Sequence, residues 1–185
     1  RYIQKIHNGN ERMIELVNTL LNVSRLELGT LVVDSKQVKL IDVIESVLEE
    51  LQGHITLQKQ RVERHIDSGV PTITTDPKLI RMVIQNLLSN ASKYTPPEGM
   101  ITISLRLADS QIEFSVSDTG IGIPKNEQED IFGKMFRAEN AKKCDVEGTG
   151  LGLYIVRQVL ETLGGHISFV SEEGKGTTFT VLLPL

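Results

Sequence analysis

Apolar residues along the chain follow two different periods, one typical of helices and one typical of strands. Helical periodicity, with apolar residues three and four positions apart, predicts helices over 3–28, 41–57, 77–94 and 150–163. Alternating polarity predicts two hairpins, which pair 100–107 with 111–117 and 166–171 with 177–183. Shorter segments predict strands at 37–40 and 61–66, a short helix near 124–133 and a polar loop over 137–148.

The first predicted helix differs from the others because its apolar residues have coiled-coil spacing. The seam positions are Ile3, Ile6, Met13, Val17 and Leu20. Further apolar residues widen this stripe, so the helix needs several neighbours, either in a helical bundle or by folding back on the rest of the chain. Gly29 is placed to cap it. The pattern therefore divides the chain into residues 1–29, an incomplete bundle, and residues 30–185, a mixed domain.

Strands and helices in the second part do not alternate regularly. Asp76 followed by Pro77 is a strong helix start, because aspartate caps free amides and proline suits the first helical position. Pro96 and Pro97 end the same helix. This order of elements predicts an α/β fold, a two-layer sandwich in which helices pack on a sheet.

Composition excludes several classes of function. The 185 residues are 39% hydrophobic, which suffices for one good core, and the formal net charge is -4 with only 4% aromatic residues. Neither value suits nucleic acid, which binds basic or aromatic surfaces. A single cysteine, Cys144, excludes an internal disulfide and indicates a cytoplasmic location. No apolar run reaches the roughly 18 residues that a membrane span needs, so we expect no membrane contact within this chain.

One face of the helix 77–94 carries polar residues beside its apolar stripe. Asn86, Asn90, Lys93 and Tyr94 fall within about 100° of one another on a helical wheel. A lone helical asparagine is usually a solvated surface residue. Two on one face suggest a use, because asparagine is unfavourable inside helices and its carbonyl is a hard, neutral donor suited to Mg²⁺.

Two glycine-rich segments supply complementary chemistry. Asp118 begins the first, in which Gly120 and Gly122 allow unusual backbone geometry and close approach, although an Asx turn is the simpler interpretation of these residues alone. The second contains Gly148, Thr149, Gly150, Leu151, Gly152 and Leu153 and opens into a helix whose N-terminus favours phosphate. It is no Rossmann motif, because Leu153 stands where glycine is needed. Gly174-Lys175-Gly176 is no Walker loop, because no serine or threonine follows the lysine.

Together these segments resemble the sensor histidine kinases and the wider ATPase superfamily that includes DNA gyrase, mismatch-repair ATPases and the large heat-shock chaperone. Asn86–Tyr94 resembles the N box, Asp118–Pro124 the first glycine box and Ile131–Arg137 the phenylalanine box. Gly148–Leu153 matches the second glycine box, and Gly174–Phe179 the glycine motif that closes the domain. Five motifs in the family's order are very specific, and they imply a mixed sheet with helices on one face.

The resemblance implies ATP and Mg²⁺ as cofactors. Asp118 is then the acceptor of the adenine amine, and Gly120, Gly122 and Ile123 complete that segment. Asn90 is the expected metal ligand with Asn86 beside it, Lys93 pairs with phosphate, and Tyr94 contacts the nucleotide. The loop 137–148 resembles an ATP lid in which Arg137, Lys142 or Lys143 reaches the γ-phosphate. For Lys142 and Lys143 a solvated basic loop is an equal alternative. Gly133, where the family commonly has an acidic residue, and Cys144 depart from its pattern.

Residue 86 bears on the type of reaction. In the gyrase-like relatives a glutamate at this position activates water, whereas the Asn86 amide takes no proton near pH 7. Slow hydrolysis favours a kinase over an ATP-operated conformational clamp, and the intact motifs argue against a domain that only binds partners. We assign catalytic roles to Asn86, Asn90, Lys93 and Arg137.

An acceptor histidine of this family precedes an acidic residue, and none of the four histidines does so. We expect the acceptor on a first bundle helix upstream of Arg1, of the same or a second protomer. The expected partners are that bundle, a response regulator receiver domain and a second copy in a homodimer. For the full-length protein we also consider anchoring in a membrane through an upstream sensor.

Overall fold

The structure is a computed structural model that describes residues 13, 17, 21, 24, 32–144 and 148–185. The chain forms two compact units, residues 1–33 and residues 34–185. In the first unit, Met13, Val17, Leu21 and Ser24 are helical, and the rest of the helix expected over 3–28 lies outside the described residues. Among the described residues, none of the helices has both the length and the apolar character that crossing a bilayer requires.

The second unit is built on a five-stranded mixed sheet. Its strands are β2 (Arg61–Ile66), β4 (Met100–Ala108), β5 (Gln111–Asp118), β6 (His166–Glu172) and β7 (Gly176–Pro184). The strand order is β2-β4-β5-β7-β6, in which β2 and β4 are parallel and all other neighbours are antiparallel. Both predicted hairpins are present, β4 with β5 and β6 with β7.

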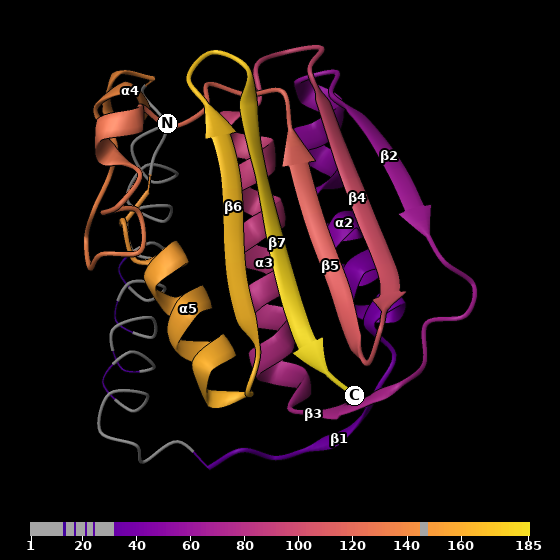
Figure 1. Ribbon diagram of the computed structural model, residues 1–185. Helices are drawn as coiled ribbons and strands as arrows, with labels where there is room; N and C mark the ends of the chain where they lie inside the picture. Colours follow the sequence, from indigo (N-terminus) through magenta and orange to yellow (C-terminus); the bar gives the residue numbers. More distant parts are fainter. Residues whose placement is uncertain (1–12, 14–16, 18–20, 22–23, 25–31, 145–147) are drawn as a thin grey trace. The chain divides into compact units, whose positions relative to one another are not determined.

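Three helices cover one face of this sheet, as Figure 1 shows. They are α2 (Leu40–Leu57), α3 (Pro77–Tyr94) and α5 (Gly152–Thr162). Ile103, Phe114 and Val181 from the sheet and Val83 and Val156 from the helices are at most 2% exposed. Each such side chain stabilises the fold by about 1.5–3 kcal/mol. The predicted two-layer α/β sandwich is confirmed.

Helix α3 begins and ends where the sequence predicts. Asp76 Oδ1 accepts hydrogen bonds from the amides of Lys78 (2.8 Å) and Leu79 (3.2 Å), and Pro77 follows it. At the other end the Tyr94 carbonyl accepts from Ile121 N–H (3.2 Å). The C-terminal half of α3 therefore lies against the segment that follows β5.

The helix predicted near 124–133 is wrong. Only the short 3-10 helix η1 (Lys125–Glu127) forms there. Successive three-residue turns follow, closed by Asp130 N–H to Glu127 O (3.2 Å) and Gly133 N–H to Asp130 O (2.7 Å). The segment buries too little apolar surface for a longer helix, because Ile131 is the only large apolar side chain within 124–133 that is buried.

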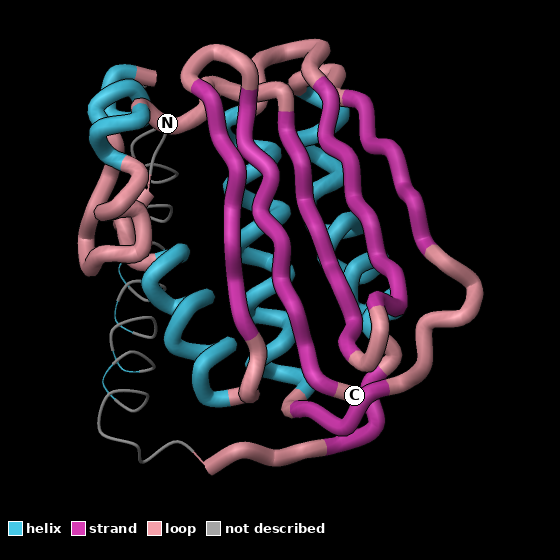
Figure 2. Tube along the Cα trace, in the orientation of Figure 1, coloured by secondary structure: helices cyan, strands magenta, loops and turns pink. Residues whose placement is uncertain are grey.

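Other boundaries also differ from the predictions. The predicted loop 137–148 contains a short helix, α4 (Glu139–Lys143). Helix α5 begins at residue 152 rather than 150, because Gly150 has a φ of +71°, which no α-helix accommodates. Strand β1 (Lys36–Val38) is offset from the predicted 37–40 and pairs with β3 (Ile73–Thr75), a strand that was not predicted. Figure 2 shows these two short strands apart from the main sheet.

Candidate nucleotide-binding site

Asp118 ends β5 at the edge of the sheet where α3 also ends. Its Oδ1 accepts hydrogen bonds from Gly120 N–H (2.8 Å) and Thr177 N–H (3.3 Å). Its Oδ2 makes no hydrogen bond to the described residues. Burial raises the pKa of this carboxyl to about 6, although the amides of Gly120 and Thr177 lower it. One oxygen is thus held by the protein, and the other is available to a hydrogen-bond donor.

Glycines around Asp118 are required by close approach of the protein's own backbone. A Cβ on Gly120 would lie 2.5 Å from Tyr94 O, and one on Gly122 would lie 2.0 Å from Glu172 O. Gly122 also has a φ of +63°. The first glycine box is therefore clamped between the end of α3 and the β6–β7 hairpin. Ile123 continues this clamp, because its amide donates to Ser171 Oγ (2.8 Å).

Asn86 lies beside the start of α5. Its Nδ2 donates to Met82 O (2.8 Å), one turn earlier on α3, which leaves Oδ1 to face Gly152. A Cβ on Gly152 would lie 2.6 Å from that oxygen. The α5 N-cap residue, Leu151, supplies no side-chain hydrogen bond, so among the described residues no side chain caps the first amides of α5. A carboxamide oxygen and a helix N-terminus that favours anions thus lie side by side.

Other residues predicted on α3 lie on the same part of the helix. Asn90 follows Asn86 by one turn and is half-buried, and Lys93 is exposed. Tyr94 Oη lies 3.9 Å from the position of a Cβ on Gly148. The end of the N box, at Tyr94, and the start of the second glycine box, at Gly148, are therefore close together.

Residues of the second glycine box shape the entry to α5. Gly150 packs against backbone, because a Cβ there would lie 2.7 Å from the Met135 carbonyl carbon. Thr149 Oγ1 accepts from Leu151 N–H (3.2 Å). Leu151 is buried and Leu153 half-buried, so their side chains help to anchor the loop.

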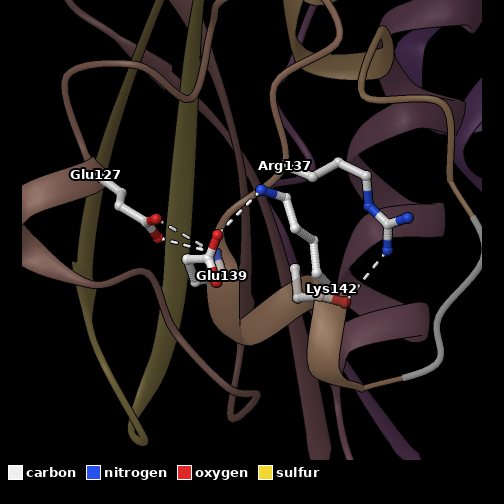
Figure 3. A network of polar contacts seen from close by, with 5 residues as sticks. Glu127, Arg137, Glu139 and Lys142 are labelled. Carbon is white, nitrogen blue, oxygen red and sulfur yellow. Dashed lines mark hydrogen bonds and ion pairs between the residues drawn. The ribbon is translucent and has the colours of Figure 1, made fainter.

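Arg137 contacts backbone on both sides of the expected lid. Its Nη1 donates to Gly148 O (3.4 Å) and its Nη2 to Ala141 O (3.2 Å), the second of which appears in Figure 3. Lys143 is exposed near the end of α4. The structure thus places Arg137 between α4 and the second glycine box.

Three residues that hold this site were not predicted from the sequence. Thr177 donates its amide to Asp118, and Ser171 Oγ accepts from Ile123. Gln128 Nε2 donates to Ile123 O (3.0 Å) and Ser171 O (3.1 Å). Thr177 lies within the closing glycine motif Gly174–Phe179, which was a usable signal. The sequence contains no such signal for Ser171 and Gln128, because they bond to backbone atoms that folding brings near them.

A cavity of about 650 Å³ adjoins Asp118 and Ile123. It shares Asp118 and Ile123 with the site, but its remaining lining comes from β5, the β6–β7 hairpin, Lys125 and Gln128. No residue of α3 or α5 lines it. The cavity therefore does not extend to α3 or to the start of α5.

This combination of fold and site defines an ATP-binding α/β sandwich. The family model of the histidine kinase-, DNA gyrase B- and HSP90-like ATPases matches residues 75–185, so the chain belongs to this family. The circadian input-output histidine kinase CikA of Synechococcus elongatus is 36% identical over 185 residues, which cover 99% of this chain but 24% of CikA. The chain thus spans about a quarter of the length of that relative.

Two solved structures are similar along nearly the whole chain. Full-length ShkA in complex with AMPPNP has a TM-score of 0.85 at 25% identity and covers 99% of this chain and 38% of that one. Histidine kinase ThkA in complex with the response regulator protein TrrA has a TM-score of 0.77 at 25% identity and covers 99% and 50%. The predicted resemblance to sensor histidine kinases is confirmed, and the chain carries their type of ATP-binding domain.

Proposed function

We propose that this chain is the catalytic core of a sensor histidine kinase, which transfers the γ-phosphoryl group of ATP to a histidine on a helical bundle. The observation that carries the proposal is the position of the Asn86 carboxamide beside the uncapped N-terminus of α5. Amide oxygens and helix amides there suit a nucleotide phosphate with its metal ion. The relation to histidine kinases supports the choice of reaction.

Adenine is recognised by Asp118. Its Oδ1 is held by two backbone amides, so Oδ2 accepts from the exocyclic amine of adenine. Guanine carries a carbonyl oxygen at that position, which a carboxylate repels. The site therefore selects ATP over GTP.

The phosphates lie between α3 and α5 in this proposal. The first amides of α5 and the Lys93 ammonium bind phosphate oxygens, and Arg137 reaches the γ-phosphate from the lid. Asn90 and Asn86 supply neutral oxygen ligands for Mg²⁺, whose chemistry is to offset the charge of the phosphates. Asn86 supports this fit of the metal ligands, because the bond of its Nδ2 to Met82 O orients Oδ1 toward the start of α5.

Transfer then depends on positioning rather than on an activated water. A histidine ring nitrogen forms the new P–N bond as the bond from the γ-phosphorus to the bridging oxygen breaks and ADP leaves. Asn86 cannot act as a general base, so water is not activated and the γ-phosphoryl group survives until the histidine arrives.

Partners and location complete the proposal. The acceptor lies on a dimeric bundle to which residues 1–29 contribute a helix, and a response regulator receiver domain takes the phosphoryl group. The complex of ThkA with the response regulator protein TrrA supports a partner of this class. We assign these reactions to the cytoplasm.

The proposal is tested by mixing this chain with Mg-ATP and a separate bundle that carries an acceptor histidine but no catalytic domain. Acid-labile, base-stable phosphate on the bundle, absent with Asp118→Ala, is the expected result. Release of phosphate to water at a steady rate without transfer would contradict the proposal and favour an ATP-operated clamp.

A further inference from the structure

Helix α4 is attached to the adenine-site segment by the side chain of Asn140. Asn140, the second residue of α4, donates from Nδ2 to Gly122 O (2.9 Å) and Ile121 O (3.4 Å). Both carbonyls belong to the segment that Asp118 begins. One amide group thus bridges the expected lid and the backbone that holds the adenine-recognising carboxylate.

The segment that Asn140 contacts also bonds to the end of α3 and to the β6–β7 hairpin. Ile121 N–H donates to Tyr94 O, and Ile121 O accepts from Gly174 N–H (2.8 Å). Gly122 lies against Glu172 O so closely that no side chain fits there. Asn140 therefore attaches α4 to the backbone segment that connects Asp118 with α3 and the β6–β7 hairpin.

The oxygen of the Asn140 amide accepts no hydrogen bond from the described residues. Its Oδ1 is buried and has no hydrogen-bond partner among the described residues. A buried amide oxygen without a partner is costly, and such exceptions call for a physical reason. A movement of α4 that exposed Oδ1 to water would give this oxygen a hydrogen-bond partner. The bonds of Asn140 to Ile121 and Gly122 therefore hold α4 but allow it to move.

A second contact acts at the start of α4. The Glu127 carboxylate accepts from Glu139 N–H through both oxygens (3.1 and 3.3 Å), as Figure 3 shows. Ala138, the N-cap residue, supplies no side-chain cap, so Glu127 replaces it from η1. Glu127 thus holds the first amide of α4, while Asn140 holds the helix to the adenine-site segment.

We propose that Asn140 is a positioning residue that couples occupancy of the adenine site to the position of the lid helix α4. The inference rests on the proposed function, because it assumes that nucleotide binds at Asp118. Adenine binding restrains the segment from Asp118 to Gly122, and Asn140 passes that restraint to α4. Lys142 and Lys143, on α4, are thereby brought into place when nucleotide is bound.

The chain contains a cysteine at which a label can measure this coupling. Cys144 is the single cysteine of the sequence, it is exposed, and it directly follows α4. A nitroxide spin label on Cys144 reports the mobility of the end of α4. Spectra are recorded with and without Mg-AMPPNP, and nucleotide binding is measured separately by calorimetry.

The informative variant is Asn140→Asp, which keeps the shape of the side chain but replaces the donor with an oxygen that faces two carbonyls. Asn126→Asp is the matched control, because Asn126 is exposed and makes no side-chain hydrogen bond to the described residues. We expect nucleotide to slow the label at least twofold in the wild type and in Asn126→Asp, and to leave it unchanged in Asn140→Asp at saturating nucleotide.

Two results would overturn the coupling. One is a label that responds equally in Asn140→Asp and in the wild type, and the other is a wild-type label that does not respond although calorimetry shows binding. If calorimetry shows no binding to the wild type, the proposed function itself fails and the coupling fails with it. The two failures are therefore distinguishable.

Discussion

The Asn86 Oδ1 atom on α3 occupies the space that a side chain on Gly152 would need, since a Cβ there would lie only 2.6 Å from it. The two residues are 66 positions apart in the sequence and belong to different boxes of the site. Glycine at the start of α5 therefore keeps the carboxamide in place beside the helix N-terminus.

Substituting Gly152 should weaken nucleotide binding more than it weakens the fold. Asn86 can turn away from a new methyl group, so Gly152→Ala should change the free energy of unfolding by less than about 1 kcal/mol. The displaced carboxamide should lower Mg-ATP affinity about tenfold, ~1.4 kcal/mol, measured by calorimetry. Gly53→Ala is the control, because nothing lies within 4 Å of a Cβ there. Equal affinities of the two variants would contradict the assignment of Asn86.

Asp118 should make nucleotide affinity depend on pH. Burial raises its pKa to about 6, and the ionised carboxylate accepts from the adenine amine more strongly than the protonated carboxyl does. Affinity should therefore fall as pH drops through about 6. Because phosphate groups titrate in the same range, the quantity to measure is the ratio of wild-type to Asp118→Asn affinity between pH 5 and 8, by calorimetry. A ratio that does not change with pH would show that this carboxylate does not bind the base.

The same substitution should stabilise the protein. A carboxyl whose pKa is higher in the folded than in the unfolded state costs stability as pH rises through the interval from about 4 to about 6. Asp118→Asn removes that charge while its side-chain oxygen still accepts from Gly120 and Thr177. At pH 7 the free energy of unfolding should rise by on the order of 2 kcal/mol, measured by urea denaturation, while ATP affinity falls. A variant that loses both stability and affinity would point to a structural role instead.

Alanine substitutions at Gly176 and Gly174 should distinguish the cost of steric clash from the cost of backbone strain. Both have positive φ, +114° and +77°. A Cβ on Gly176 would lie 1.9 Å from Asp118 O, whereas nothing lies within 4 Å of one on Gly174. We expect Gly174→Ala to cost about 1 kcal/mol and Gly176→Ala at least about 3 kcal/mol, measured by denaturant unfolding. Only Gly176→Ala should also lose ATP affinity, and equal costs would show that Asp118 is not held by this contact.

Asp76 should be a major contributor to the stability of α3. It accepts from the amides of Lys78 and Leu79 and, through Oδ2, from Asp34 N–H (2.8 Å). Burial alone would raise its pKa, but these three donors lower it below the ordinary value of 3.8. The stabilisation is therefore present at neutral pH and is lost as pH falls below about 4. Asp76→Ala should cost about 2 kcal/mol at pH 7, measured by thermal unfolding, and the exposed Asp67→Ala should cost almost nothing.

Sequence patterns predicted the elements that bury a long apolar face. Helix α3 shows why, because Asp76, Pro77 and the periodic apolar residues each indicate the same boundaries. The failures are short segments without such a face. Strand β3 has three residues, too few to show a period, and α4 buries only Ala141 and depends on Glu127, a distant side chain.

Site residues were predicted where their chemistry is local. Asp118 and the asparagines of α3 stand in recognisable motifs, and the structure brings Asn86 to the start of α5. Their assigned roles in binding remain predictions. The side chains that hold these residues, such as Ser171, Gln128 and Asn140, bond to backbone atoms brought near by folding. The spacing of residues along the sequence does not predict such contacts.

The central claim is that Asp118 and the α3–α5 junction bind ATP through its adenine ring. Calorimetric titration of the protein with Mg-ATP and with Mg-GTP tests this most directly. The account predicts a saturable ATP site with one nucleotide per chain and GTP affinity at least about 100-fold weaker, a difference of ~2.7 kcal/mol. No heat of binding with ATP, or equal affinity for the two nucleotides, would contradict it.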